Sequence, residues 1–166
     1  TSASWEAGIK FSTEAVSLQL AAFTADYDDF ISQQVVGGSF TPMDPAQYQF
    51  VNYDAVAIDG VEAKANFRMG NGFYSRFAIA YADGDILSPG QAPAPLDTID
   101  PLNLVLGIGY RQPQGRFGGE LIATHHARKP LDETDGGYRP DAFTILDATA
   151  FFAVTDALKL RAGIFN

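Results

Sequence analysis

The sequence contains no cysteine among its 166 residues. This excludes a disulfide framework and any zinc site built on cysteine. It also has no run of about 18 apolar residues, which excludes a transmembrane helix. Basic residues are scarce: 11 Lys and Arg stand against 20 Asp and Glu, for a formal net charge of -9. Because binding to nucleic acid needs clustered basic residues, nucleic acid is excluded as a partner.

Catalytic motifs are missing as well. The spacing supports no Ser-His-Asp arrangement, and the sequence has no phosphate-binding loop. The Gly-rich stretch 69–72 is typical of a turn rather than of a nucleotide motif. We therefore expect a protein that is not an enzyme, with no catalytic residue, no metal site and no permanently bound cofactor.

Apolar and polar residues alternate along most of the chain, and a helical period is nearly absent. Residues 102–110 show this most clearly, because the even-numbered positions are large and apolar while the odd-numbered ones are mostly small or polar. This pattern predicts an all-β fold, an antiparallel up-and-down meander of about eight strands. The expected strands are 4–12, 16–34, 50–68, 73–84, 102–112, 116–128, 141–153 and 157–165.

The expected connections alternate in length. Short turns fall near 12–15, 69–72, 112–115 and 154–157, and long loops near 36–49, 85–101 and 129–140. Outer-membrane barrels have this asymmetry, with tight periplasmic turns and long extracellular loops, and each of their strands needs only about 10 alternating residues. The sequence therefore predicts part of a transmembrane β-barrel, with its apolar face toward outer-membrane lipid and its charged face toward the lumen.

The alternation alone leaves two other folds open. A soluble, lipocalin-like ligand-binding barrel has the same period with the two faces exchanged. A self-contained eight-stranded outer-membrane barrel with a structural or adhesive role fits the chain length. Glycine and alanine at many polar-face positions, and aromatic residues near the strand ends, favour the membrane.

Several segments carry a family resemblance. Residues 52–62 resemble the strand of TonB-dependent receptors in which an apolar-rich stretch leads to Gly-Val-Glu. Residues 158–166 are similar to their penultimate strand. Asp-Pro-Leu at 100–102, followed by Gly-x-Gly-Tyr-Arg at 107–111, is similar to the haem and haemoglobin receptor branch, as is 118–129.

The resemblance implies a barrel of about 22 strands with an N-terminal plug that carries the TonB box. Residues 1–166 are then expected to be the C-terminal portion of a larger barrel, with the plug domain and the final strand absent. The implied function is TonB-dependent uptake of an iron chelate, haem or a siderophore, at the bacterial outer membrane. The implied partners are the TonB complex, acting through the plug, and the iron chelate or a haem protein.

Four residues near one loop are candidates for ligand contact. His125 and His126 are the only histidines, and Arg128 and Tyr138 follow them. Since neighbours on a strand point to opposite faces, we expect His126 to face the lumen and His125 to face outward. Both then cannot bind one iron, so His126 alone is the candidate axial ligand of haem. Arg128 is a candidate contact for a propionate or for an anionic lipopolysaccharide group, and Tyr138 is a candidate loop ligand. The alternatives are an interfacial polar pair and a solvated basic cluster.

Charged residues are also expected inside the barrel. By parity Glu120 and Asp147 point toward the lumen, where the two carboxylates could meet. We expect them instead to balance Arg68, Arg76 and Arg161 within the barrel wall.

Overall fold

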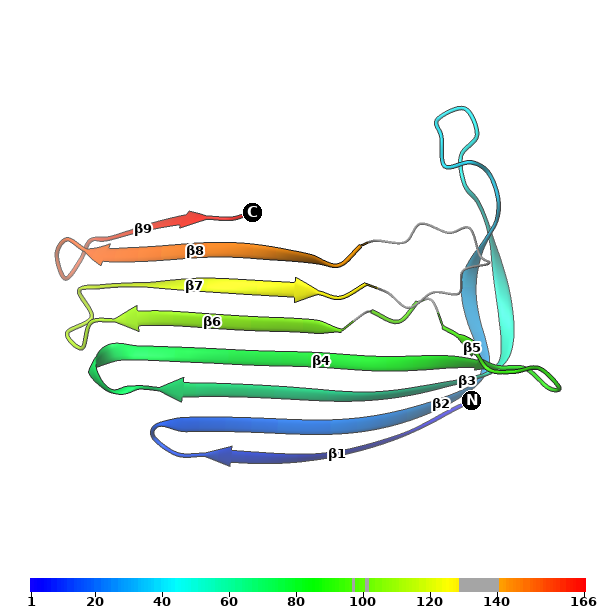
Figure 1. Cartoon of the computed structure of the whole chain (residues 1–166), viewed down its shortest axis with the longest axis horizontal. Helices are drawn as coiled ribbons and strands as arrows, with labels where there is room; N and C mark the ends of the chain where they lie inside the picture. Colours follow the sequence, from blue (N-terminus) through cyan, green and yellow to red (C-terminus); the bar gives the residue numbers. More distant parts are fainter. Residues whose placement is uncertain (97, 101, 129–140) are drawn as a thin grey trace.

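The computed structural model describes residues 1–96, 98–100, 102–128 and 141–166, and these residues form one antiparallel sheet (Figure 1). A short 3-10 turn, η1, spans Gly70–Gly72. Among the described residues, none belongs to a helix long and apolar enough to cross a membrane. The long strands are β1 Ser2–Ser12, β2 Val16–Gly37, β3 Gln47–Arg68, β4 Phe73–Leu87, β6 Asn103–Arg111, β7 Phe117–His126, β8 Phe143–Ala153 and β9 Lys159–Ile164.

Each long strand pairs with the next one along the chain, in the order β1-β2-β3-β4-β6-β7-β8-β9. Every pairing is antiparallel, which confirms the predicted meander. A ninth strand, β5 Ala94–Pro95, was not predicted, because it lies in a proline-rich stretch that is typical of a loop. It is only two residues long and pairs with Asp85 and Ile86 of β4.

Strands β2 and β3 are longer than predicted, at 22 residues each. The pairing of β1 with β2 ends at Tyr27, and the pairing of β4 with β3 ends at Ala55. The outer parts of the two strands, residues 29–37 and 47–53, therefore pair only with each other. We call this two-stranded part the ribbon. Figure 1 shows it turning away from the rest of the sheet.

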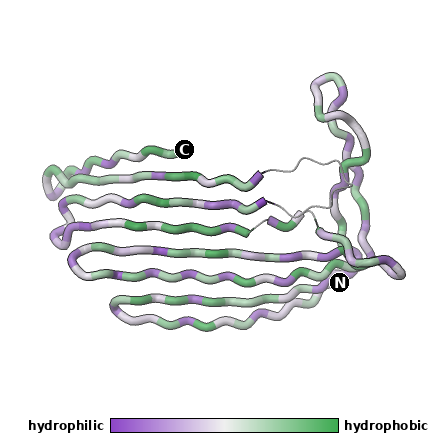
Figure 2. Tube along the Cα trace, viewed as in Figure 1, coloured by the Kyte–Doolittle hydropathy of each residue, from purple (hydrophilic) through white to green (hydrophobic). Residues whose placement is uncertain are grey.

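The sheet has one apolar face whose large side chains are exposed. Trp5 is 78% exposed, Leu121 67% and Ile164 76%. Among the described residues, only Ala25, Val56 and Leu96 are buried hydrophobic residues, so this sheet has no core of its own comparable to that of a water-soluble domain. Figure 2 shows hydrophobic and hydrophilic residues alternating along the strands, as the period of two requires.

The two ends of the sheet differ. The turns that join β1 to β2, β3 to β4, β6 to β7 and β8 to β9 are short and lie together at one end (Figure 1). The longer connections β2–β3, β4–β6 and β7–β8 leave from the other end. We call these the turn end and the loop end. The predicted alternation of short and long connections is thus confirmed.

The described strands do not close into a cylinder. β1 and β9 stand at the two ends of the strand order, and within the described residues they do not pair with each other. A partial barrel has this form. The open sheet disagrees with the two alternative folds, because each needs the strands to close on themselves. These alternatives are the soluble lipocalin-like barrel and the self-contained eight-stranded barrel.

Candidate functional site

The two histidines end strand β7 at the loop end, and the structure separates them. The ring of His126 stacks on Phe143 of β8, with centroids 4.7 Å apart and planes at 21°. His125 Nδ1 lies 2.9 Å from Oγ1 of Thr144. The opposite orientation expected from strand parity agrees with these contacts, since Phe143 and Thr144 are also neighbours on one strand. The proposed role of either histidine in ligand binding stays a prediction.

Arg128 follows the histidines and forms an ion pair with Asp141, across the β7–β8 connection. Both side chains are largely exposed to solvent. Arg128 also lines a small cavity of about 220 Å³ at the loop end, together with Asp83, Asp100 and Leu96. Its charge is therefore shared with a carboxylate, which weakens its attraction for a ligand propionate. The fourth candidate, Tyr138, lies outside the described residues.

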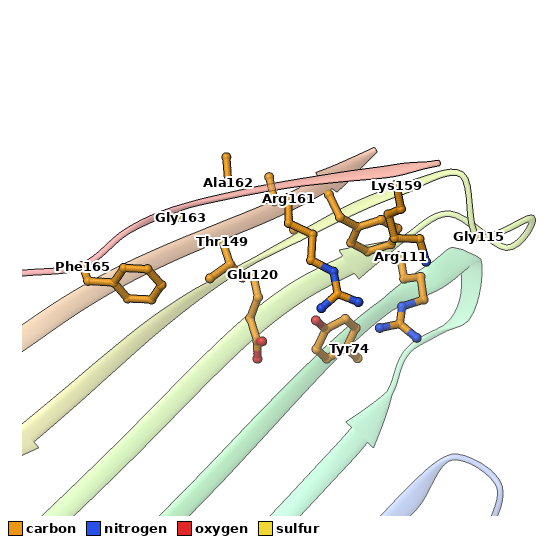
Figure 3. Close-up of a pocket in the computed structure, with 13 residues that line it drawn as sticks. Tyr74, Arg111, Gly115, Glu120, Thr149, Lys159, Arg161, Ala162, Gly163 and Phe165 are labelled. Carbon is orange, nitrogen blue, oxygen red and sulfur yellow. The ribbon is translucent and has the colours of Figure 1, made fainter. Parts of the chain in front are cut away.

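A larger site lies on the polar face at the turn end (Figure 3). It is a cavity of about 690 Å³ to which β4, β6, β7, β8 and β9 all contribute. A second cavity, of about 850 Å³, adjoins it and shares Tyr74, Arg111 and Glu120 with it. The charged and aromatic residues of the first cavity are Tyr74, Arg111, Glu120, Phe151, Lys159, Arg161 and Phe165.

One ion pair joins two strands of this site. Nε of Arg76 lies 2.6 Å from Oε1 of Glu120, whose side chain is only 14% exposed. This confirms the expectation that an arginine balances Glu120. Among the described residues Asp147 forms no ion pair with an arginine, and it accepts a 3.3 Å hydrogen bond from the backbone N–H of Asn166. Arg68 also forms no ion pair within the part of the chain that the structure describes, and it donates to the carbonyl oxygen of Glu14 at 2.9 Å in the adjacent turn.

Two further cations meet at one aromatic ring. Cζ of Arg111 lies 5.6 Å from the ring centroid of Phe151, and Nζ of Lys159 lies 5.0 Å from it. Both distances are within the range of cation–π attraction. From the sequence alone, no site role was assigned to Arg111, Phe151 or Tyr74. The available signal was parity, because Gly107, Gly109 and Arg111 share one face of β6.

Glycines on this face make room for the side chains of the adjacent strands. A Cβ on Gly109 would lie 2.2 Å from Cζ of Tyr74. A Cβ on Gly107 would lie 2.7 Å from Cγ of Arg76 and 2.9 Å from Oε1 of Glu120. Strand glycines often mark such close approaches. The Gly-x-Gly pattern of β6 therefore lets the ring of Tyr74 and the Arg76–Glu120 pair lie flat across the sheet.

These features define a class of protein. An antiparallel meander with an exposed apolar face, ionic contacts on the opposite face, and short turns opposite long loops is the wall of a transmembrane β-barrel. The sequence model for the family described as TonB dependent receptor-like, beta-barrel, matches residues 1–166, and the chain belongs to this family.

Individual proteins support the same family. The hemoglobin and hemoglobin-haptoglobin-binding protein of Haemophilus ducreyi is 24% identical over 97% of this chain and 20% of its own length. The solved structure of the copper transporter OprC has a TM-score of 0.81 and 19% identity, over 99% of this chain and 25% of that one. The ferric enterobactin receptor of Pseudomonas aeruginosa has a TM-score of 0.69 and 16% identity, over the same shares.

The identities and the matched lengths decide what these comparisons show. The structural likenesses, at 19% and 16% identity, show the fold. The chain spans about a fifth to a quarter of the length of the proteins it matches. The family and these proteins are receptors and transporters rather than enzymes, as the sequence predicts.

Proposed function

We propose that this chain is part of the wall of a bacterial outer-membrane receptor that takes up an iron chelate, haem or a siderophore, with energy supplied through TonB. The observation that carries the proposal is the exposed apolar face of a meander that belongs to the TonB-dependent receptor family. An apolar surface of this extent is stable only against an apolar medium, which for such a sheet is lipid.

The names of the relatives support the class of ligand. Receptors named for haemoglobin and haemoglobin–haptoglobin match most of this chain. Among the structural neighbours are receptors named for ferric enterobactin and for siderophores. An iron chelate is the ligand class that these names have in common. We favour haem, because the sequence relatives are named for haemoglobin, which is a haem protein.

We further propose that residues 1–166 are the C-terminal portion of the barrel. The plug domain and the final strand then belong to other parts of the protein, and the TonB complex acts through the plug. In this arrangement the chain contributes wall and loops, and its ligand-facing residues lie at the loop end. His126 is the candidate haem ligand there, with Arg128 and Tyr138 as candidate contacts.

The experiment is a haem titration of the full-length protein in detergent, followed by absorbance. His126→Ala removes the ring on the polar face, and His125→Ala is the matched control on the opposite face of the same strand. We expect a Soret shift in the wild type and in His125→Ala, with loss of the shift, or at least a tenfold weaker affinity (about 1.4 kcal/mol), in His126→Ala.

The other outcomes are equally informative. A shift kept in both variants would place the iron ligands in other loops or in the plug and would remove His126 from the site. If the Soret band shifts in neither the wild type nor the variants, haem is excluded as the transported ligand. A siderophore then remains as the chelate to be tested.

A further inference from the structure

The turn end of the polar face is basic, although the chain as a whole is acidic. The formal net charge is -9, with 20 acidic and 11 basic residues. The residues that line the two cavities at the turn end include five basic ones but one acidic one, Glu120. The basic residues are Arg68, Arg76, Arg111, Lys159 and Arg161.

The single carboxylate is already engaged. Glu120 is paired with Arg76 at 2.6 Å. Among the residues that the structure describes, Arg111, Lys159 and Arg161 form no ion pair. We call these three residues the cationic cluster. The ring of Phe151 attracts two of them, but an aromatic ring carries no net charge and leaves theirs uncompensated.

The geometry of the cluster suits an anionic group. Arg111 extends from β6 and Lys159 and Arg161 from β9, and Figure 3 shows the three side chains pointing into the same cavity as the hydroxyl of Tyr74. The planar fork of an arginine matches the two oxygens of a carboxylate or a phosphate. Thr149 on β8 places a further hydroxyl in the lining.

We propose that the cationic cluster is a binding site for an oxyanion, a carboxylate or phosphate group, on the inner face of the barrel at the turn end. The group has two possible sources: an acidic side chain of a part of the receptor outside residues 1–166, or a free anion. The site rests on the polar face being the inner face of a barrel, as proposed above, and does not depend on which chelate is transported.

The first arm of the test looks for a polypeptide carboxylate. A zero-length carbodiimide reagent joins an amine to a carboxylate only when the two are in contact. We expect the full-length protein in detergent to give a cross-link from Lys159 to an Asp or Glu outside residues 1–166, identified by mass spectrometry. Lys159→Arg keeps the charge and removes the amine, so the cross-link should disappear while the thermal midpoint stays unchanged.

The second arm looks for a free anion. Inorganic phosphate is titrated at constant ionic strength while the thermal midpoint of the full-length protein is followed. A bound anion raises the midpoint with concentration, because it binds only the folded state. The double variant Lys159→Gln/Arg161→Gln should lose the rise. Lys10→Gln is the matched control, because Lys10 lies on the polar side of β1 and lines neither cavity.

The two arms separate the sources. A Lys159 cross-link without a phosphate effect supports the site and assigns it to the receptor's own polypeptide. A phosphate effect lost in the double variant supports the site and assigns it to a free anion. The proposal is overturned if neither a Lys159 cross-link nor a phosphate effect is found. It is also overturned if Lys10→Gln removes the phosphate effect as completely as the double variant does. A failed haem titration would leave all these outcomes unaffected, so the two proposals fail separately.

Discussion

At Gly109 the absence of a side chain decides where the ring of Tyr74 lies. The two residues face each other across the β4–β6 pairing, and the ring occupies the space that a Cβ would take. Gly107 does the same for the Arg76–Glu120 pair. On this face, small residues on one strand therefore leave space for the large and charged side chains of the adjacent strands.

This arrangement predicts a coupling between Gly109 and Tyr74. Gly109→Ala should destabilise the full-length protein by about 1–3 kcal/mol, the usual cost of overpacking. In a Tyr74→Ala background the same substitution should be neutral, because the ring that it displaces is gone. The measurement is the free energy of unfolding of the two single variants and the double variant. Additive effects of the two substitutions would contradict the close approach.

Strand parity is the part of the site that the sequence alone could predict. Parity correctly separated His125 from His126 and placed Glu120 on the same face as Arg76, because it depends only on neighbours along one strand. The meeting of Arg111 and Lys159 at Phe151 depends on the register of strands β6 to β9, which a single sequence does not specify. Alternation therefore gave the face of each side chain, but it could not give its partner.

The ribbon of β2 and β3 is the element that departs most from the sheet. Residues 29–37 and 47–53 have no third strand beside them, whereas residues 17–27 pair on both sides. The sequence predicted these two strands but ended them early, at 34 and 50. The glutamines and apolar residues there lack the strong alternation that marks a strand with one face against lipid.

The ribbon should exchange its amide hydrogens faster than the rest of the same strands. A two-stranded hairpin is only marginally stable in water, and strands paired on both sides open less often. Hydrogen exchange followed by mass spectrometry on the full-length protein in detergent should show slow exchange in residues 17–27 and fast exchange in 29–37. Uniform protection along β2 would contradict the description of the ribbon as a separate two-stranded part.

For the molecule as a whole, the orientation of the two faces is the central claim. The apolar face exposes side chains such as Leu121, Leu146 and Ile164, while the Arg76–Glu120 ion pair and two cavities lie on the other face. The meander and the uneven connections could be predicted because they are encoded locally, in alternation and in turn residues. The pairing of β5 with β4 could not be predicted from the sequence, because it brings a proline-rich loop segment back onto β4.

The most direct test of this claim compares two adjacent residues of β7. Leu121 is 67% exposed on the apolar face, and Ile122 points to the polar face beside Asp147. The measurement is the free energy of unfolding of the full-length protein from lipid bilayers, with Leu121→Lys and Ile122→Lys. If the apolar face meets lipid, Leu121→Lys costs about 2–4 kcal/mol and Ile122→Lys clearly less. A neutral Leu121→Lys beside a costly Ile122→Lys would mean that the exposed face meets water, and would contradict the barrel wall.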